Sequence, residues 1–146
     1  MKAHLDVITL AVRDIEKAVA FYRDGLGLPT KGIVGTEFPA TERDAAGAAA
    51  FFKMAGGVML ALYPRQELAK DAGISDAPPS SVEFSLGYFA ESESDVDALI
   101  ARAVAAGGSR TEPPRTRPWV IYSGYFRDPD GHLWEVIWNP KAATTQ

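Results

Sequence analysis

The strongest constraint on the fold of this chain is an order of elements that occurs twice. Each half of the sequence reads as a strand, a helix and three further strands, although few residues are identical between the halves. The second series begins about 75 residues after the first, and a repeat of this length indicates two copies of one supersecondary unit. The strands are expected at residues 5–12, 30–38, 48–54 and 58–63, and again at 82–90, 109–111, 120–127 and 132–138.

The segment between the two series is typical of a connection. Residues 64–81 contain a short helical pattern and end in two prolines and two serines, which favours a linker. A chain of 146 residues fits one domain of common size. We therefore expect a single domain over residues 1–146, with a first module at 4–63, a linker at 64–81 and a second module at 82–140.

Each module carries one helix with a clear starting signal. Asp14 stands where a carboxylate can accept the first free backbone N–H groups, and apolar residues follow it at helical spacing. Ser92, with Asp95 three residues later, resembles a capping box. The strand at 5–12 alternates large branched side chains with smaller ones. Because side chains alternate between the faces of a strand, one face of the sheet is predicted to pack against a helix and the other to be open.

Composition and charge exclude several classes of function. The chain has a net charge of −4, so it lacks the basic surface of a nucleic-acid binder, and it has no cysteine, which excludes disulfides and thiolate metal sites. No apolar stretch approaches the length of about 20 residues that spans a membrane, and no signal peptide is evident. We expect a cytoplasmic protein that binds neither nucleic acid nor a membrane.

Two motifs of the modules point to a known family. The first module carries VITLAVRDIEKAVAFYRDGLGL, and the second ends in YFRDPDGHLWEVIWNP. Together they resemble the vicinal oxygen chelate superfamily, the group of glyoxalase I, the bleomycin resistance proteins and the extradiol dioxygenases. The resemblance covers nearly the whole chain and implies an α+β fold. In that fold two tandem βαβββ modules form an open, cup-shaped mixed β-sheet with the helices on its convex side.

The resemblance also implies four metal-ligand positions, on the first and last strand of each module. They fall on Val7, Ala61, Ser85 and Glu135. Valine and alanine cannot coordinate a metal, and serine is a poor ligand for the divalent ions of this family. One carboxylate does not build a site that needs several ligands. We therefore expect no cofactor and no divalent metal.

Glu135 is the unusual residue of the last strand, because it lies between Trp134 and Val136 in a run that otherwise reads as core. If the tryptophans of this strand pack beneath a helix, Glu135 faces the cup. There it could act as a general acid or base, or anchor a ligand by a hydrogen bond. The alternative is a residue inherited from metal-binding relatives that now pairs with an arginine or with water.

Aromatic, apolar and hydroxyl-bearing side chains are expected to line the cup and to bind an apolar or planar ligand. Ordinary core packing is the alternative for each of them. Arg115, Arg117 and Arg127 are expected to be solvated surface charges, and His132 a turn residue. The expected ligand-binding residues are Phe51, Met59, Tyr63, Ser85, Phe89, Trp119, Tyr122 and Tyr125.

These observations lead to a principal hypothesis and two alternatives. The principal hypothesis is a glyoxalase/bleomycin-resistance-like protein that binds a small apolar or aromatic molecule in the cup without a catalytic metal. The first alternative is a lyase, isomerase or dioxygenase of the same superfamily that uses Glu135 as a metal ligand or as a general acid or base. The second is a structural or regulatory module with no small ligand. The resemblance further implies a homodimer.

Overall fold

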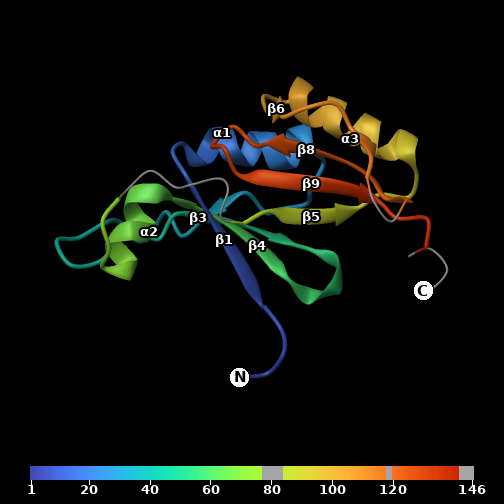
Figure 1. Ribbon diagram of the computed structural model, residues 1–146. Coiled ribbons are helices and arrows are strands. Elements are labelled where there is room, and N and C mark those ends of the chain that lie inside the picture. Colours follow the sequence, from blue (N-terminus) through green and yellow to red (C-terminus); the bar gives the residue numbers. More distant parts are fainter. Residues whose placement is uncertain (77–83, 118–119, 142–146) are drawn as a thin grey trace. The chain divides into compact units, whose positions relative to one another are not determined.

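The computed structural model describes residues 1–76, 84–117 and 120–141, and the chain divides into two compact units, Met1–Pro79 and Ser80–Gln146 (Figure 1). Each unit contains one open mixed sheet with a helix packed against it. The predicted α+β class, with two tandem modules, is therefore confirmed. In the part of the chain that is described, every helix is too short or too polar to cross a membrane.

The sheet of the first unit brings the first and last strands of the module together. Its order is β1 (Val7–Val12), β4 (Met59–Pro64), β3 (Ala49–Lys53) and β2 (Ile33–Val34). β1 runs parallel to β4, whereas the other neighbours are antiparallel. A parallel pair needs a long crossover connection, and here that connection contains the helix and the two remaining strands.

The helix of the first unit begins at the predicted cap. The Asp14 carboxylate accepts a hydrogen bond from the backbone N–H of Lys17 at 3.1 Å, and α1 (Ile15–Val19) follows. The predicted helix does not continue as one regular element, because it widens into the π-helix Ala20–Gly25. The buried Tyr22 ring of this segment lies 6.0 Å from the Phe52 ring of β3, so the helix covers one face of the sheet.

A second helix of the first unit, α2 (Arg65–Ala72), follows β4 directly. It lies within the predicted linker, close to the expected helical pattern. The Glu67 carboxylate of α2 accepts a hydrogen bond from the backbone N–H of Ala46 at 2.7 Å, and this contact fastens the loop before β3.

The second unit repeats the arrangement of the first. Its sheet has the order β5 (Leu86–Phe89), β9 (Leu133–Trp138), β8 (Tyr122–Arg127) and β6 (Ser109–Arg110), and β7 (Arg115–Thr116) also pairs with β8. β5 runs parallel to β9, as β1 does to β4. The first strand of each module therefore lies beside the last, as a structural repeat requires.

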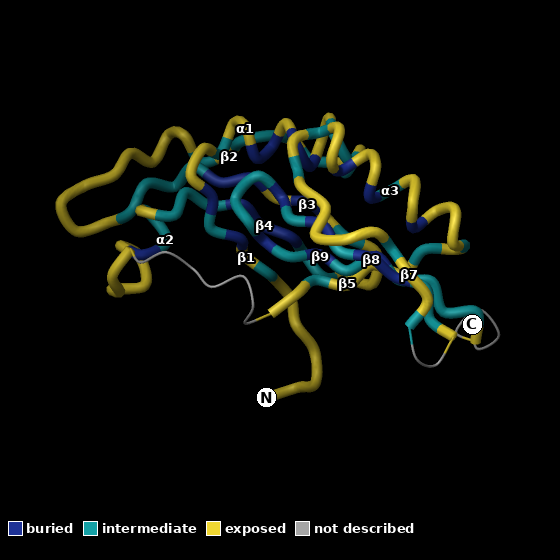
Figure 2. The backbone as a smooth tube through the Cα atoms, turned by 45° about the horizontal axis from the view of Figure 1, so that its top comes forward, coloured by how far each residue is buried: buried dark blue, intermediate teal, exposed yellow. Residues whose placement is uncertain are grey.

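The helix α3 (Glu93–Ala105) packs closely on this second sheet. The predicted cap is confirmed, since the Ser92 hydroxyl accepts a hydrogen bond from the backbone N–H of Asp95 at 3.1 Å. Gly124 allows the close approach, because a Cβ atom there would lie 2.7 Å from Cδ1 of Ile100 and 2.8 Å from Cγ of Pro114. Figure 2 shows buried residues along the strands and exposed residues along the outer side of α3.

The turn between β8 and β9 is held by one buried carboxylate. Asp128 accepts hydrogen bonds from the backbone N–H groups of Asp130 and His132, each at 2.9 Å. Its second oxygen lies 2.6 Å from Nδ1 of His132, whose side chain is also buried. The expectation that His132 is a turn residue agrees with this geometry.

The strand predicted at residues 30–38 is the main difference between expectation and structure. Only the two residues of β2 form a strand there, because Gly32 and Gly35 on either side adopt left-handed backbone angles, with φ of 87° and 79°. Gly35 is also crowded, since a Cβ atom at this position would lie 2.3 Å from the carbonyl oxygen of Gly47. The segment is therefore a loop, and its backbone passes close to the residues that lead into β3.

A pair of glycine variants tests this close approach. Gly35 and Gly56 both have positive φ, but a Cβ atom at Gly56 would meet no atom within 4 Å. Gly56→Ala should therefore cost only the strain of the left-handed backbone, about 1–2 kcal/mol of unfolding free energy. Gly35→Ala should cost about 1–3 kcal/mol more, because backbone must move as well. Urea unfolding of the two variants measures the difference, and equal losses would contradict the crowding at Gly35.

Candidate functional site

The open face of the first unit is apolar. On β1 the buried residues Leu10 and Val12 face the helix, whereas Val7 and Thr9 lie on the other face and are exposed. The strand registers place further side chains on the open face, since paired residues share a face of a sheet. These side chains are Met59, Ala61 and Tyr63 of β4, which pair with Val7, Thr9 and Ala11, and Phe51 and Lys53 of β3.

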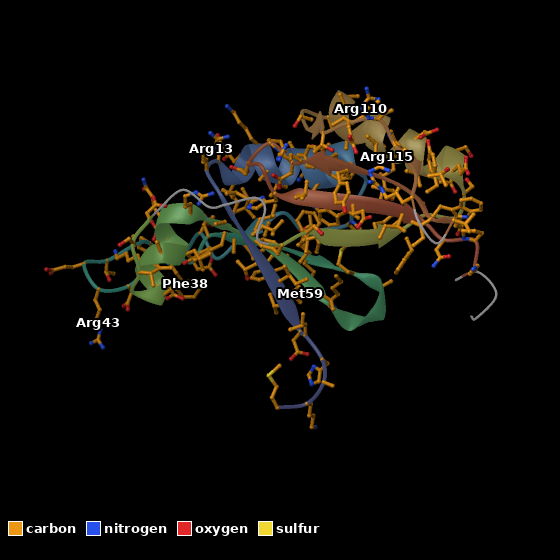
Figure 3. All side chains as sticks on the ribbon, viewed as in Figure 1. Arg13, Phe38, Arg43, Met59, Arg110 and Arg115 are labelled. Atoms are coloured by element: carbon orange, nitrogen blue, oxygen red, sulfur yellow. The ribbon has the colours of Figure 1, made fainter. Side chains whose placement is uncertain are left out.

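A pocket of about 630 Å³ lies at one side of this open face. Two expected ligand-binding residues, Phe51 and Met59, contribute to its lining, and 42% of the surface of Phe51 is exposed. Met59 is labelled in Figure 3, near the start of β4. The full lining consists of Pro29, Thr30, Lys31, Gly32, Val34, Phe51, Lys53 and Met59.

The loop that walls this pocket is fastened to the sheet. The Thr30 hydroxyl donates a hydrogen bond to the carbonyl oxygen of Phe51 at 2.7 Å. The same hydroxyl oxygen accepts a hydrogen bond from the backbone N–H of Gly32 at 3.2 Å. One hydrogen bond thus holds the wall against β3, and the other closes a turn within the wall, so the pocket is part of the folded unit rather than a gap beside a loose loop.

The open face of the second unit is more polar. Glu135 on β9 pairs directly with Tyr125 on β8 and with Gly87 on β5. Its neighbours in the strand, Trp134 and Val136, are buried on the helix side, so Glu135 lies on the open face, half-buried. A recess of about 380 Å³ lies on this unit, lined by Phe84, Ser85, Thr111, Tyr125 and Leu133.

Glu135 and Tyr125 are coupled. Burial raises the pKa of the Tyr125 phenol above its ordinary value, and the charge of Glu135 and a hydrogen bond to Glu135 raise it further. The Arg117 guanidinium acts in the opposite direction, because its central carbon lies 5.6 Å from the centre of the Tyr125 ring. Tyr125 is therefore a protonated hydrogen-bond donor at neutral pH, beside a carboxylate that accepts.

Arg117 is held in place by contacts that leave its side chain only 20% exposed. Its Nε donates to the Ser123 hydroxyl at 2.6 Å, and Nη2 donates to the Ser123 carbonyl at 3.4 Å. Nη2 also lies 3.8 Å from the Glu112 carboxylate. Arg117 was expected to be a solvated surface charge, and the structure instead packs it over Tyr125 and the buried Ser123.

The other expected ligand-binding residues are not all brought together. The Tyr122 hydroxyl donates to the Asp97 carboxylate of α3 at 2.7 Å, so this side chain lies on the helix side, opposite Glu135. The Tyr63 hydroxyl donates to the carbonyl oxygen of Ala46 and supports a loop. Phe89 lies at the end of β5 and is 70% exposed. Trp119 is outside the described residues.

The side chains at the four metal-ligand positions implied by the sequence do not fit a metal ion. Val7 and Ala61 lie on the open face of the first unit, and neither carries a ligand atom. Ser85 and Glu135 lie on the second unit, where only Glu135 offers a carboxylate. Among the residues that the structure describes, no three His, Cys, Asp or Glu side chains are grouped so that they could hold a metal ion.

Sequence reasoning missed the site positions of three side chains. Lys53 is two residues from Phe51 on the same strand, so period-2 alternation already implied a shared face. Arg117 follows the short strand β7, which was not expected because prolines surround it. Lys31 had no such signal, because its position depends on the left-handed glycine that follows it.

Comparison with known proteins identifies the family. The family model described as "Glyoxalase/Bleomycin resistance protein/Dioxygenase superfamily" matches residues 4–136. No curated protein is significantly similar in sequence.

Solved structures agree with the family model. The chain is 32% identical to a glyoxalase-related enzyme from Fulvimarina pelagi, with a TM-score of 0.76 over 95% of this chain and 90% of that one. A lactoylglutathione lyase from Agrobacterium tumefaciens is 26% identical, with a TM-score of 0.63 and 97% of each chain covered. A fosfomycin resistance protein from Listeria monocytogenes has a similar fold, with 24% identity, a TM-score of 0.66 and 95% of each chain covered. The chain belongs to the glyoxalase/bleomycin resistance protein/dioxygenase superfamily.

Proposed function

We propose that this protein binds a small apolar or aromatic molecule on the open face of its first unit, without a catalytic metal. The observation that carries the proposal is the pocket of about 630 Å³ whose lining includes Phe51, Met59 and Val34. Pockets for small molecules have volumes of about 300–1,000 Å³ and are lined mainly by apolar side chains. A half-exposed phenylalanine in such a pocket gains from being covered by a ligand.

The nature of the four family ligand positions supports the metal-free part of the proposal. Three of these four positions carry valine, alanine and serine. Such side chains bind divalent metal ions weakly or not at all. The similar structures include a lactoylglutathione lyase, so the fold is also compatible with catalysis. The apolar pocket favours binding.

A screen for thermal stabilisation by aromatic metabolites and antibiotics tests the proposal. Compounds that raise the melting temperature of the wild type should bind the Phe51→Ala variant roughly 10- to 150-fold more weakly, because the lost ring removes about 1.5–3 kcal/mol of apolar contact. Phe38→Ala is the matched control, since Phe38 is 63% exposed and lies on a loop away from Met59 (Figure 3). If Phe51→Ala binds as tightly as the control, the pocket is not the ligand site.

A second candidate function is acid–base catalysis without a metal on the second unit. The observation that favours it is the pairing of Glu135 with Tyr125, which lines a recess together with Ser85 and Thr111. A carboxylate that accepts a proton and a phenol that donates one are the two roles that such catalysis needs. A stoichiometric divalent ion in the purified protein that is lost in Glu135→Ala would overturn the metal-free form of both candidates.

The effect of Glu135 on the pKa of Tyr125 can be measured by titration. A phenol whose pKa is raised by folding stabilises the protein fully below the ordinary pKa of about 10, and this contribution is lost as the pH rises through the folded value. Glu135→Gln removes the negative charge and should lower the pKa of Tyr125 toward its ordinary value. Ultraviolet titration of phenolate between about pH 9 and pH 12 measures the change. Tyr125→Phe identifies the transition, and an unshifted titration in Glu135→Gln would contradict the coupling.

We also propose that the protein is a homodimer. The edge strands β1 and β5 carry the exposed apolar residues Val7 and Phe89, at 48% and 70% exposure. Large exposed apolar side chains at sheet edges favour contact with a second chain. Light scattering at micromolar concentration should give twice the chain mass of 15.7 kDa, and a single-chain mass would contradict the proposal.

A further inference from the structure

We infer that the ligand of the first-unit pocket is an organic anion with an apolar or aromatic body, whose acidic group pairs with Lys31 and Lys53. This inference rests on the proposed binding function and adds the charge of the ligand to it. Both lysines belong to the lining of the pocket, together with the apolar side chains of Phe51 and Met59.

The charge of the pocket is one-sided. Two of the eight lining residues are lysines and none is an aspartate or glutamate. The chain as a whole carries a net charge of −4, so a pocket whose charged side chains are all positive does not reflect an overall basic composition. A cationic ligand would be repelled here, and a neutral ligand would gain nothing from either ammonium group.

The two lysines reach the pocket from different elements. Lys53 lies at the end of β3, on the face shared with Phe51, and pairs in register with Met59. Lys31 lies in the loop that the Thr30 hydroxyl fastens to the carbonyl oxygen of Phe51. One lysine therefore lies beside the apolar residues of β3 and the other in the loop that walls the same pocket. An amphipathic anion bound there would contact both apolar and positively charged side chains.

Among the residues that the structure describes, neither lysine forms an ion pair with another side chain. In the described segments the ion pairs that involve this unit join other residues, such as Arg23 with Asp24 at 2.9 Å. Both lysines are exposed, so their ammonium groups keep water until a ligand arrives. A lysine on a flexible stem can then contact an acidic group without the cost of burying an isolated charge.

The alternative role of the lysines is to cover apolar surface with their methylene stems, and the experiment separates the two roles. Isothermal titration calorimetry should compare 1-naphthoate with its neutral amide, 1-naphthamide. The two probes share one apolar body and differ in charge. The variants are the double substitution Lys31→Gln with Lys53→Gln, the pocket variant Phe51→Ala, and Lys17→Gln as a control for the loss of a lysine on α1, outside the pocket lining.

The expected result is a preference for the anion that depends on both lysines. One ion pair at about 4 Å in water contributes about 1 kcal/mol, or about fivefold in affinity. With one or both ammonium groups engaged, the wild type and Lys17→Gln should therefore bind 1-naphthoate about 5- to 25-fold more tightly than 1-naphthamide at low ionic strength. The double variant should bind both equally, and high salt should reduce the preference in the wild type. Phe51→Ala should weaken both probes.

The outcomes distinguish the inference from the function on which it rests. If 1-naphthamide binds the wild type as tightly as 1-naphthoate and Phe51→Ala weakens both, the pocket binds ligands but the anion inference is wrong. If the double variant keeps the full preference for the anion, the inference is likewise wrong. If neither probe binds the wild type at millimolar concentration, or Phe51→Ala changes neither affinity, the proposed function fails and the inference fails with it.

Discussion

The parallel pairing of the first strand with the last strand of each unit is the constraint on which the rest of the structure depends. β1 lies beside β4, and β5 beside β9, in both cases with the same direction. Parallel neighbours cannot be joined by a tight turn, so the chain must cross over one face of the sheet. The helix of the crossover covers that face of the sheet. The other face stays open and carries every second side chain of each strand.

The two open faces use this common geometry for different chemistry. On the first unit, Met59 and the exposed ring of Phe51 line an apolar hollow whose lining also includes two lysines. On the second, a carboxylate faces a phenol whose proton is retained, and a guanidinium packs over the phenol ring. An internal repeat thus supplies the same scaffold twice, whereas single substitutions within the strands decide what each copy can contact.

Much of the fold could be predicted from the sequence because its signals are local. The caps at Asp14 and Ser92 and the alternation along 5–12 depend on near neighbours in the chain, and all three are found in the structure. The break in the strand at 30–38 could not be predicted with the same means. The break depends on the close approach of Gly35 to the backbone of Gly47, twelve residues later. It also depends on backbone angles that a pattern of apolar residues does not reveal. The placement of the candidate site residues could be predicted only where strand alternation determines it. Phe51, Met59 and Ser85 line hollows, whereas Tyr122 turns to Asp97 because its strand parity is opposite to that of Tyr125.

The buried Asp128 carboxylate has a consequence beyond the turn in which it lies. By binding the backbone N–H groups of Asp130 and His132, it determines how many residues separate β8 from β9. A hairpin that slipped by one residue would turn Glu135 toward α3 and expose Trp134 and Val136 instead, since side chains alternate with a period of two. The turn that Asp128 holds thus sets the register of the second sheet, and with it the face on which this protein presents Glu135.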